Sequence, residues 1–277
     1  KFLTYISRNR FDLDNFFRTK YVFPTIYRSS MYGTGKIFNF FNDSWICVAC
    51  FLVITYLLFD LFMKLKTGFI VLKRKELRAS EQYISFIDYG KQGVITQKSI
   101  ATMAKNSLKS KKYARVLASA VRYYQAKQTL ELGTSLGITS AYLASASSSS
   151  LVTMEGDPQV AAIAKQLWEQ LGLHNIKCII GNFDNTLTEL GDTQFDIIYV
   201  DGNHHYAPTI RYFEQLQHNA KVDTLFIFDD IHYSPAMEQA WQQIKSSDKC
   251  GVSIDLFFLG FVFCRPVLQK QHFVLRF

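Results

Sequence analysis

The sequence predicts a doubly wound α/β fold, in which a mostly parallel sheet of seven strands carries helices on both faces and ends in an antiparallel hairpin. Two observations lead to this prediction. From residue 128 onward, short apolar runs typical of buried strands alternate with segments that have apolar residues at helical spacing. The last two apolar runs have no helix between them, so we expect them to pair as the C-terminal hairpin.

Composition and charge set wide limits on the function. The chain has 277 residues, of which 48% are hydrophobic and 19% are charged, so it is a folded protein of one or two domains. Its net charge of +8 suits an acidic partner or an anionic membrane surface, but also a basic surface with no partner. The five Cys lack the spacing of a disulfide framework, which favours a reducing compartment.

We place a domain boundary near residue 85, after an N-terminal region (1–85) that we expect to be helical. Residues 45–63 form an apolar run with a single acid, Asp60. A membrane-spanning helix needs about 20 mostly apolar residues, and basic residues follow this run, which would place the following domain in the cytoplasm. Because Asp60 would be costly in lipid, a buried helix, a helix on a membrane surface, a dimer helix and an error in the gene model stay open as alternatives.

The second domain, residues 86–277, begins with a basic lead-in. Residues 91–127 show apolar side chains at helical spacing with Lys and Arg between them, so we expect helices here. We interpret Lys109, Lys111 and Lys112 as a solvated junction between two helices.

Five strands and five helices then alternate. Each strand is a short apolar run, and Pro158 in the first turn of the second helix is a typical helix start. The expected strands are 128–132, 151–155, 176–181, 195–201 and 224–230. The expected helices are 133–147, 157–172, 185–190, 207–219 and 234–247. The two final strands are expected at 252–265 and 271–277.

Polar and acidic residues gather where these strands end. Open parallel sheets bind their ligands outside the carboxyl ends of the strands, so residues at these positions are the candidates for a site. They are Glu131, Gly133 and Gly137 after the first strand, Glu155 after the second, and Asn182, Phe183 and Asp184 after the third. Asp201, His204 and His205 follow the fourth strand, and Asp229, Asp230 and His232 follow the fifth.

The first of these turns, "ELGTSLG", differs from the dinucleotide pattern G-x-G-x-x-G. We expect Gly133 to let the backbone approach a ligand closely, and Gly137 to let the helix pack on the strand. Glu131 would repel a pyrophosphate but would accept a hydrogen bond from an amino group. Glu155 lies where an acid commonly holds ribose hydroxyls, so an adenosine with a charged amino-acid tail suits both acids.

Five motifs taken together carry a resemblance to a known family. They are "TLELGTSLGITSAYLA", "VTMEGD", "IIGNFDNTL", "DIIYVDGNHHY" and "FIFDDIHYS". In this order they resemble the class I S-adenosylmethionine-dependent methyltransferases, which have a Rossmann-like fold, and within them the small-molecule O-methyltransferase branch. The resemblance implies S-adenosylmethionine as cofactor. Its methionine part would lie near Glu131, Gly133 and Gly137, its ribose near Glu155, and its adenine near Asn182 and Phe183.

The resemblance to the metal-dependent members of this branch further implies a Mg²⁺ site. Asp201, Asp229 and Asp230 match the positions of its ligands, and Asp201 also borders the cofactor. His204, three residues after the first ligand, matches the base that takes the acceptor's proton. His205 and His232 are the alternatives for this base, and a role of Asp229 or Asp230 as helix cap or cofactor contact stays open.

We therefore expect methyl transfer to an oxygen of a small-molecule acceptor, a sugar or a phenol, with or without a divalent ion. The first rival interpretation is an NAD-dependent oxidoreductase, against which the missing third glycine and Glu131 both count. The second is a membrane-attached cofactor-binding or interaction module without catalysis. We expect no nucleic acid partner, and we leave open a dimer and membrane association through residues 45–63.

Overall fold

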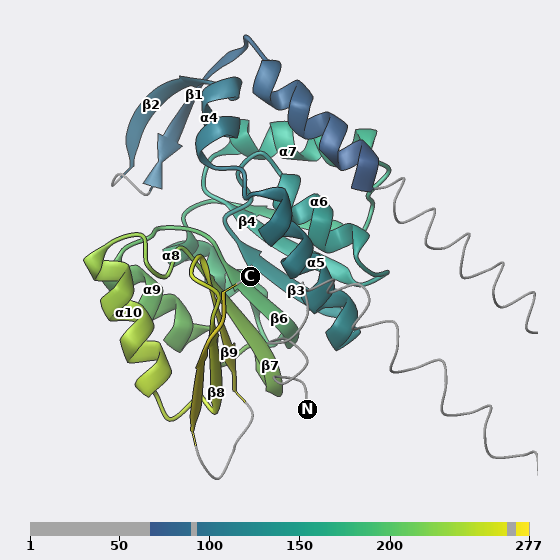
Figure 1. Cartoon of the computed structure of the whole chain (residues 1–277). Helices are drawn as coiled ribbons and strands as arrows, with labels where there is room; N and C mark the ends of the chain where they lie inside the picture. The colour runs from purple at the N-terminus through teal and green to yellow at the C-terminus, as the bar shows by residue number, and fades with distance from the viewer. Residues whose placement is uncertain (1–66, 90–92, 265–269, 277) are drawn as a thin grey trace, which may run out of the picture. The chain divides into compact units, whose positions relative to one another are not determined.

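The computed structural model describes residues 67–89, 93–264 and 270–276 (Figure 1). The chain divides into two compact units, Lys1–Phe69 and Ile70–Phe277, and the second unit holds every strand of the described residues. The apolar run 45–63 lies outside the described residues. Among the residues that are described, no helix combines the length and the apolar character needed to cross a membrane. The boundary expected near residue 85 falls inside strand β1 (Tyr83–Asp88) and stays a prediction.

The central feature is an eight-stranded sheet with the order β10-β8-β9-β7-β6-β3-β4-β5 (Figure 1). Strands β5, β4, β3, β6 and β7 run parallel, whereas β9 is antiparallel to both β7 and β8. The mostly parallel sheet with a C-terminal antiparallel hairpin is confirmed, with one strand more than the seven expected. The strands are β3 (Gln128–Leu132), β4 (Ser150–Glu155), β5 (Ile176–Ile180), β6 (Phe195–Val200), β7 (Ala220–Asp229), β8 (Val252–Asp255), β9 (Leu259–Phe263) and β10 (Gln271–Val274).

The C-terminal strands pair differently from our expectation. The hairpin forms inside the single run 252–265, where β8 and β9 pair across a short turn. In this turn the Asp255 carboxylate accepts a hydrogen bond from the backbone N–H of Phe257 at 2.8 Å, and Phe257 has a positive φ of 75°. No Gly or Pro marks the turn, so apolar patterning alone could not place it. The last strand, β10, runs parallel to β8 at the edge of the sheet.

Helices cover both faces of this sheet. In Figure 1, α9 and α10 lie on one face, and α5 (Lys111–Tyr124), α6 and α7 lie on the other. Capping side chains explain several helix starts, since Asp157 accepts hydrogen bonds from two backbone N–H groups of α7, and Ser234 accepts one from α10. The helices after β3 are α6 (Ile138–Ser145), α7 (Pro158–Gln170), α8 (Phe183–Thr186) with the 3₁₀ turn η2 (Leu187–Leu190), α9 (Tyr206–Gln215) and α10 (Pro235–Ser246).

The lead-in to the sheet is helical only in part. A helix covers residues 67–79, and α4 (Ile100–Asn106) and α5 (Lys111–Tyr124) follow later. Between them, β1 and β2 (Val94–Ser99) form an antiparallel two-stranded sheet, which overturns the helix expected from residue 91. The β-branched run that begins β2 favours a strand, and α4 starts only after Ser99, which accepts a hydrogen bond from the Thr102 N–H.

Asp157 joins this small sheet to the start of α7. One carboxylate oxygen caps α7, through the N–H groups of Gln159 at 2.8 Å and Val160 at 3.1 Å. The other oxygen accepts a hydrogen bond from the backbone N–H of Ile87 in β1 at 2.9 Å. A single side chain therefore orders both the start of a helix and the position of the β1–β2 hairpin.

We predict that Asp157→Ala lowers the free energy of unfolding by about 1–3 kcal/mol, because it removes a helix cap and a tertiary hydrogen bond together. Denaturant unfolding of the full chain, followed by circular dichroism, measures this. Asp192→Ala is the matched control, since the Asp192 side chain is 99% exposed and its loss should change little. Equal stability of the two variants would contradict the double role of Asp157.

Candidate functional site

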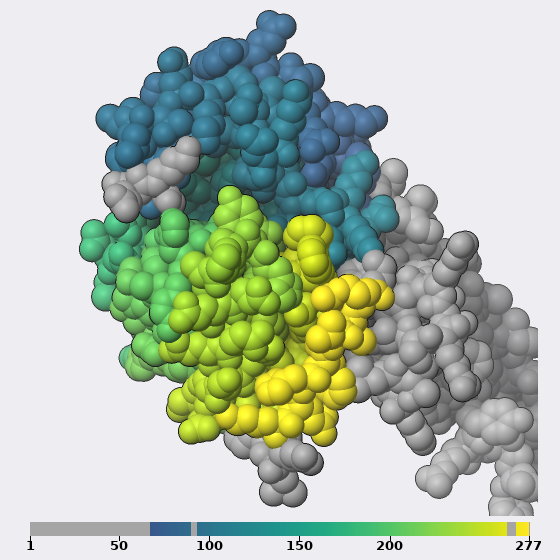
Figure 2. Space-filling view, turned by 60° about the vertical axis from the view of Figure 1, so that its left-hand side comes forward, coloured from purple at the N-terminus to yellow at the C-terminus, as the bar shows by residue number. Residues whose placement is uncertain are grey.

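A cavity of about 880 Å³ lies at the carboxyl ends of the parallel strands. The ends of β3 to β7 line one side, and β1, β2 and the segment from α4 to the start of α5 line the other. Figure 2 shows these two walls on one face of the molecule, the blue N-terminal elements opposite the green and yellow-green C-terminal ones. The cavity thus has the position in which ligands of doubly wound sheets bind.

The cavity brings together most, but not all, of the residues that the sequence singled out. Those that line it are Gly133, Glu155, Asn182, Phe183, Asp184, Asp201, His204, Asp229 and Asp230. Four others do not line it: Glu131, Gly137, His205 and His232. His232 instead pairs with Asp255 at 2.7 Å and packs on the Phe257 ring, so it belongs to the turn between β8 and β9.

Gly133 is required by the close approach of two strand ends. Its φ is 102°, and a Cβ atom there would lie 2.7 Å from the carbonyl carbon of Asp201. The Asp201 N–H in turn donates to the carbonyl of Leu132 at 2.8 Å. Any side chain at position 133 would therefore push apart the ends of β3 and β6 before it met a ligand.

Gly137 serves helix packing. A Cβ atom there would lie 2.8 Å from both the Ala164 Cβ and the Trp168 Nε1. Trp168 also donates a hydrogen bond from Nε1 to the Gly137 carbonyl at 2.9 Å. We expected this glycine to let the helix pack on the strand, but the element that packs closely against it is α7.

Glu131 is fully buried on the side of β3 that faces α6 and β4. Its carboxylate accepts hydrogen bonds from the hydroxyls of Ser140 and of Thr153, the latter at 2.7 Å. Burial raises the pKa of Glu131 to about 7, although these hydrogen bonds lower it. Its Oε1 atom has no hydrogen-bond partner among the described residues. The side chain is connected to the glycine turn through Thr153, whose hydroxyl also pairs with that of Thr134 at 2.6 Å.

Glu155 borders the cavity directly and holds the turn after β3. Its carboxylate accepts hydrogen bonds from the backbone N–H groups of Ser135 at 2.8 Å and Asp157 at 3.1 Å. Burial raises the pKa of Glu155 to about 7, and the nearby Asp157 charge adds to the rise, while the backbone hydrogen bonds oppose it. This carboxyl can accept hydrogen bonds from hydroxyl groups of a ligand.

Asn182 and Phe183 form the neighbouring part of the wall. Asn182 caps α8 by accepting a hydrogen bond from the Asp184 N–H at 3.0 Å. The Phe183 ring lies edge-on to Tyr212, with 5.9 Å between the ring centroids, and packs against Gly202, where a Cβ atom would lie 2.8 Å from it. The face of the Phe183 ring, with the small Gly202 beside it, is suited to packing against a flat ring of a ligand.

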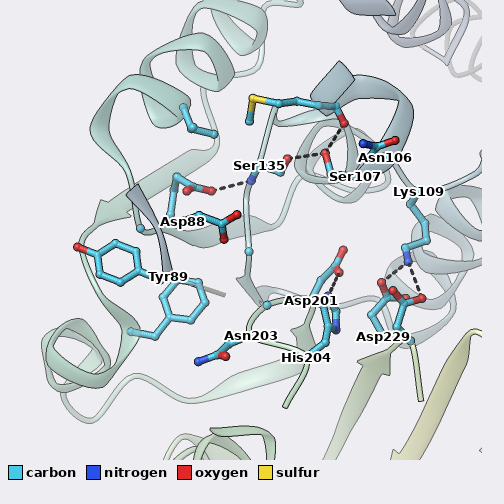
Figure 3. Close-up of a pocket in the computed structure, with 18 of the residues that line it drawn as sticks. Asp88, Tyr89, Asn106, Ser107, Lys109, Ser135, Asp201, Asn203, His204 and Asp229 are labelled. Atoms are coloured by element: carbon cyan, nitrogen blue, oxygen red, sulfur yellow. Dashed lines mark hydrogen bonds and ion pairs between the residues drawn. The ribbon is translucent and has the colours of Figure 1, made fainter. Parts of the chain in front are cut away.

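An acidic cluster with His204 lies at the ends of β6 and β7 (Figure 3). The Tyr199 hydroxyl donates to Asp201 at 2.7 Å, and the His204 Nε2 lies 3.6 Å from the other oxygen of Asp201. Asp229 is buried, and its Oδ1 has no hydrogen-bond partner among the described residues. Burial, followed by the charge of Asp201, raises the pKa of Asp229 well above its ordinary value. Burial also raises the pKa of Asp201.

Lys109 is the residue of this site that the sequence interpretation missed. We expected a solvated junction, but its side chain is only 12% exposed and its ammonium contacts Asp229 and lies 3.7 Å from Asp230 (Figure 3). Burial lowers the pKa of Lys109, but the charges of the three carboxylates outweigh it and raise the pKa to about 12. In the sequence, the only sign of this role was the number of acidic residues at the strand ends. Such a cluster needs a positively charged partner from another segment of the chain.

The side chains that could together bind one metal ion differ from the three ligands that we expected from the sequence. The nearest ligand atoms of Asp201, His204 and Asp229 lie within 4.8 Å of one another. Asp230 is absent from this group among the described residues, and it faces Lys109 instead. Oxygen and imidazole ligands suit a divalent ion, but one of the two carboxylates already contacts an ammonium.

Aromatic side chains line the part of the cavity beside this cluster. Tyr113 and Phe258 meet edge-on with 5.2 Å between their centroids, and Tyr233 lies 6.1 Å from the His204 ring. Their spacing in the sequence carries no motif, so only the folded chain brings them together.

Comparisons with known proteins agree with this geometry. The model of a family described as a methyltransferase domain matches residues 130–231. A catechol O-methyltransferase of Niastella koreensis is 31% identical over 113 residues, which cover 39% of this chain and 50% of the relative. The chain spans half the length or less of the curated relatives it matches.

Solved structures share the fold. A Podospora anserina methyltransferase with S-adenosylhomocysteine bound has a TM-score of 0.52 at 17% identity, covering 57% of this chain and 80% of that one. An O-methyltransferase of Bacillus cereus, also with S-adenosylhomocysteine, has a TM-score of 0.50 at 19% identity, covering 57% and 83%. Residues 130–231 therefore match a methyltransferase domain, curated relatives of this part of the chain include a catechol O-methyltransferase, and the fold is that of solved methyltransferases.

Proposed function

We propose that the protein transfers the methyl group of S-adenosylmethionine to a hydroxyl oxygen of a small molecule. One observation carries the proposal. A single cavity is lined both by the turn residues and acid expected to hold the cofactor and by an imidazole beside an acidic cluster. An adenosine cofactor and an acceptor hydroxyl would therefore meet in one space, which is the main requirement of an in-line transfer.

The cofactor side of the cavity is formed by the ends of β3, β4 and β5. Glu155 would accept the ribose hydroxyls, and Asn182 with Phe183 would border the adenine. Gly133 would bring the backbone of the turn close to the methionine part. Glu131 would act on that turn through Thr153 and Thr134, and Gly137 through its packing on α7. The bound cofactor would supply an electrophilic methyl group, whose transfer to the acceptor oxygen leaves S-adenosylhomocysteine.

The acceptor side lies at the ends of β6 and β7. The His204 Nε2 would take the proton of the acceptor hydroxyl as the oxygen attacks, because a neutral imidazole is a suitable base near neutral pH. Asp201, 3.6 Å away, would stabilise the imidazolium that forms. The aromatic side chains of Tyr113, Tyr233 and Phe258 favour a phenol-like acceptor over a sugar.

The structure of the described residues gives no evidence on the cellular location or the oligomeric state of the protein. A cytoplasmic catalytic domain, membrane association through residues 45–63 and a dimer stay predictions from the sequence. The need for a divalent ion is a separate matter, because it depends on Lys109.

The first test is the binding of S-adenosylhomocysteine by calorimetry. Glu155→Ala should weaken it by about 1–3 kcal/mol, the loss expected for hydrogen bonds to a charged group. Glu169→Ala, on the exposed side of α7, is the matched control and should bind as the wild type does. An unchanged affinity in Glu155→Ala would remove the ribose assignment. Binding of NAD in place of S-adenosylhomocysteine would overturn the proposed function itself.

Binding should also depend on pH. With a pKa of about 7, Glu155 is protonated in the free protein at acidic pH, whereas the ribose hydroxyls bind best to the carboxylate. Affinity should therefore rise with pH, by up to about tenfold per unit below pH 7, and level off above it. Calorimetry between pH 5.5 and 8.5 measures this affinity, over about one pH unit or more on each side of the Glu155 titration. Glu155→Gln should flatten the profile, and a slope that survives in this variant would assign it to another group.

The third test concerns the base. Once a screen of phenols and sugars with labelled S-adenosylmethionine has found an acceptor, His204→Ala should lower kcat by about 10²–10⁴-fold. S-adenosylhomocysteine should still bind to this variant, because His204 lies on the acceptor side. His205→Ala is the comparison, since the neighbouring side chain is exposed and outside the cavity lining, and it should retain the wild-type rate. A larger loss in His205→Ala than in His204→Ala would reverse the assignment.

A further inference from the structure

Lys109 reaches the acidic cluster from a segment far away in the sequence. It lies 120 residues before Asp229, in the connection between α4 and α5. Its ammonium contacts Asp229 and lies 3.7 Å from Asp230, and the side chain is largely buried. A buried ammonium needs compensating charge, and these carboxylates provide it.

The backbone around Lys109 is held in place from two sides. The Arg74 guanidinium donates hydrogen bonds to the carbonyls of Lys109 and of Leu108, the latter at 3.1 Å. The Ser107 hydroxyl bonds to that of Ser135 at 3.0 Å, in the turn after β3. Because the connection is tied to both the lead-in helix and the main sheet, the ammonium is positioned before any ligand arrives.

A divalent ion at the cluster would have to share these carboxylates with the ammonium. The three side chains that could hold an ion include Asp229, whose carboxylate Lys109 already contacts. Two cations beside one buried carboxylate repel each other strongly, because the low effective dielectric of a buried site screens charges weakly. The electrostatics of the cluster therefore allow the ammonium or the metal ion, but disfavour both together.

We infer that Lys109 is the resident cation of this site and takes the place beside Asp229 that a divalent ion held by Asp201, His204 and Asp229 would otherwise occupy. The carboxylates of Asp229 and Asp230 beside the ammonium compensate its positive charge. An ammonium has three N–H donors, and the contact with Asp229 uses one of them. Resting on the proposed function, Lys109 would donate a hydrogen bond to the acceptor oxygen as His204 removes its proton. Methyl transfer would then need no added metal.

The test is Mn²⁺ binding to the full chain, measured by the loss of the electron paramagnetic resonance signal of free Mn²⁺. The wild type should bind no more Mn²⁺ than the Asp229→Asn variant does. Lys109→Ala removes the competing charge and should bind Mn²⁺ at least about tenfold more tightly than the wild type. The gain should disappear in Lys109→Ala/Asp229→Asn, because that variant lacks a ligand.

Two further variants separate charge from structure. Lys111→Ala removes an exposed positive charge two residues away, at the start of α5, and should bind Mn²⁺ as the wild type does. Lys109→Arg keeps the charge and should exclude Mn²⁺, whereas Lys109→Gln should admit it if the Ala variant is too unstable to measure. Thermal melts of each variant without metal show whether it is folded.

Two results would overturn the inference. One is a wild-type Mn²⁺ site that Asp229→Asn removes, and the other is a folded Lys109→Ala or Lys109→Gln variant that gains no Mn²⁺ affinity. Neither depends on methyl transfer. Calorimetry with S-adenosylhomocysteine on the same proteins tests the proposed function separately, so the two can fail independently.

Discussion

The ion pair between Lys109 and Asp229 is the interaction on which the geometry of this site depends. Asp201 and Asp229 lie at the ends of adjacent parallel strands, and Asp229 is 1% exposed. Carboxylates buried side by side are costly unless a cation or a proton compensates them. The ammonium supplies this compensation from the connection between α4 and α5. The charge at the strand ends therefore determines where a segment outside the parallel sheet must lie.

Segments that precede the match to the methyltransferase family build much of the cavity. The family match begins at residue 130, whereas the hairpin β1–β2, Lys109 and Tyr113 all come before it. The Asp157 side chain and the Ser107–Ser135 hydrogen bond join these earlier elements to the sheet. The family match therefore covers the strand ends that line one side of the cavity, but not the segments that line the other side. The choice of acceptor is expected to depend on the lead-in segments, where the family match gives no guidance.

The floor of the cavity is made of closely packed backbone. At Gly133 the end of β3 lies against the backbone of Asp201, and at Gly202 the chain after β6 lies against the Phe183 ring. Neither position has space for a Cβ atom without displacement of a neighbour. The strand ends that would carry cofactor and base are consequently packed closely together, as a transfer between two bound molecules requires.

The sequence alone determined those features that depend on residues near one another along the chain. Apolar periodicity was sufficient for the parallel strands, and the rule that ligands bind at strand ends was sufficient to gather Gly133, Glu155, Asp201, His204 and Asp229 at one cavity. Pairing between distant segments was decided only by the tertiary structure. β10 joins β8 rather than β9, and Glu131 turns toward Ser140 and away from the cavity. Lys109 is largely buried although the two residues after it are exposed. Its ammonium pairs with the carboxylate of Asp229, 120 residues further along the chain. Local sequence patterns cannot reveal charge complementarity between residues so far apart.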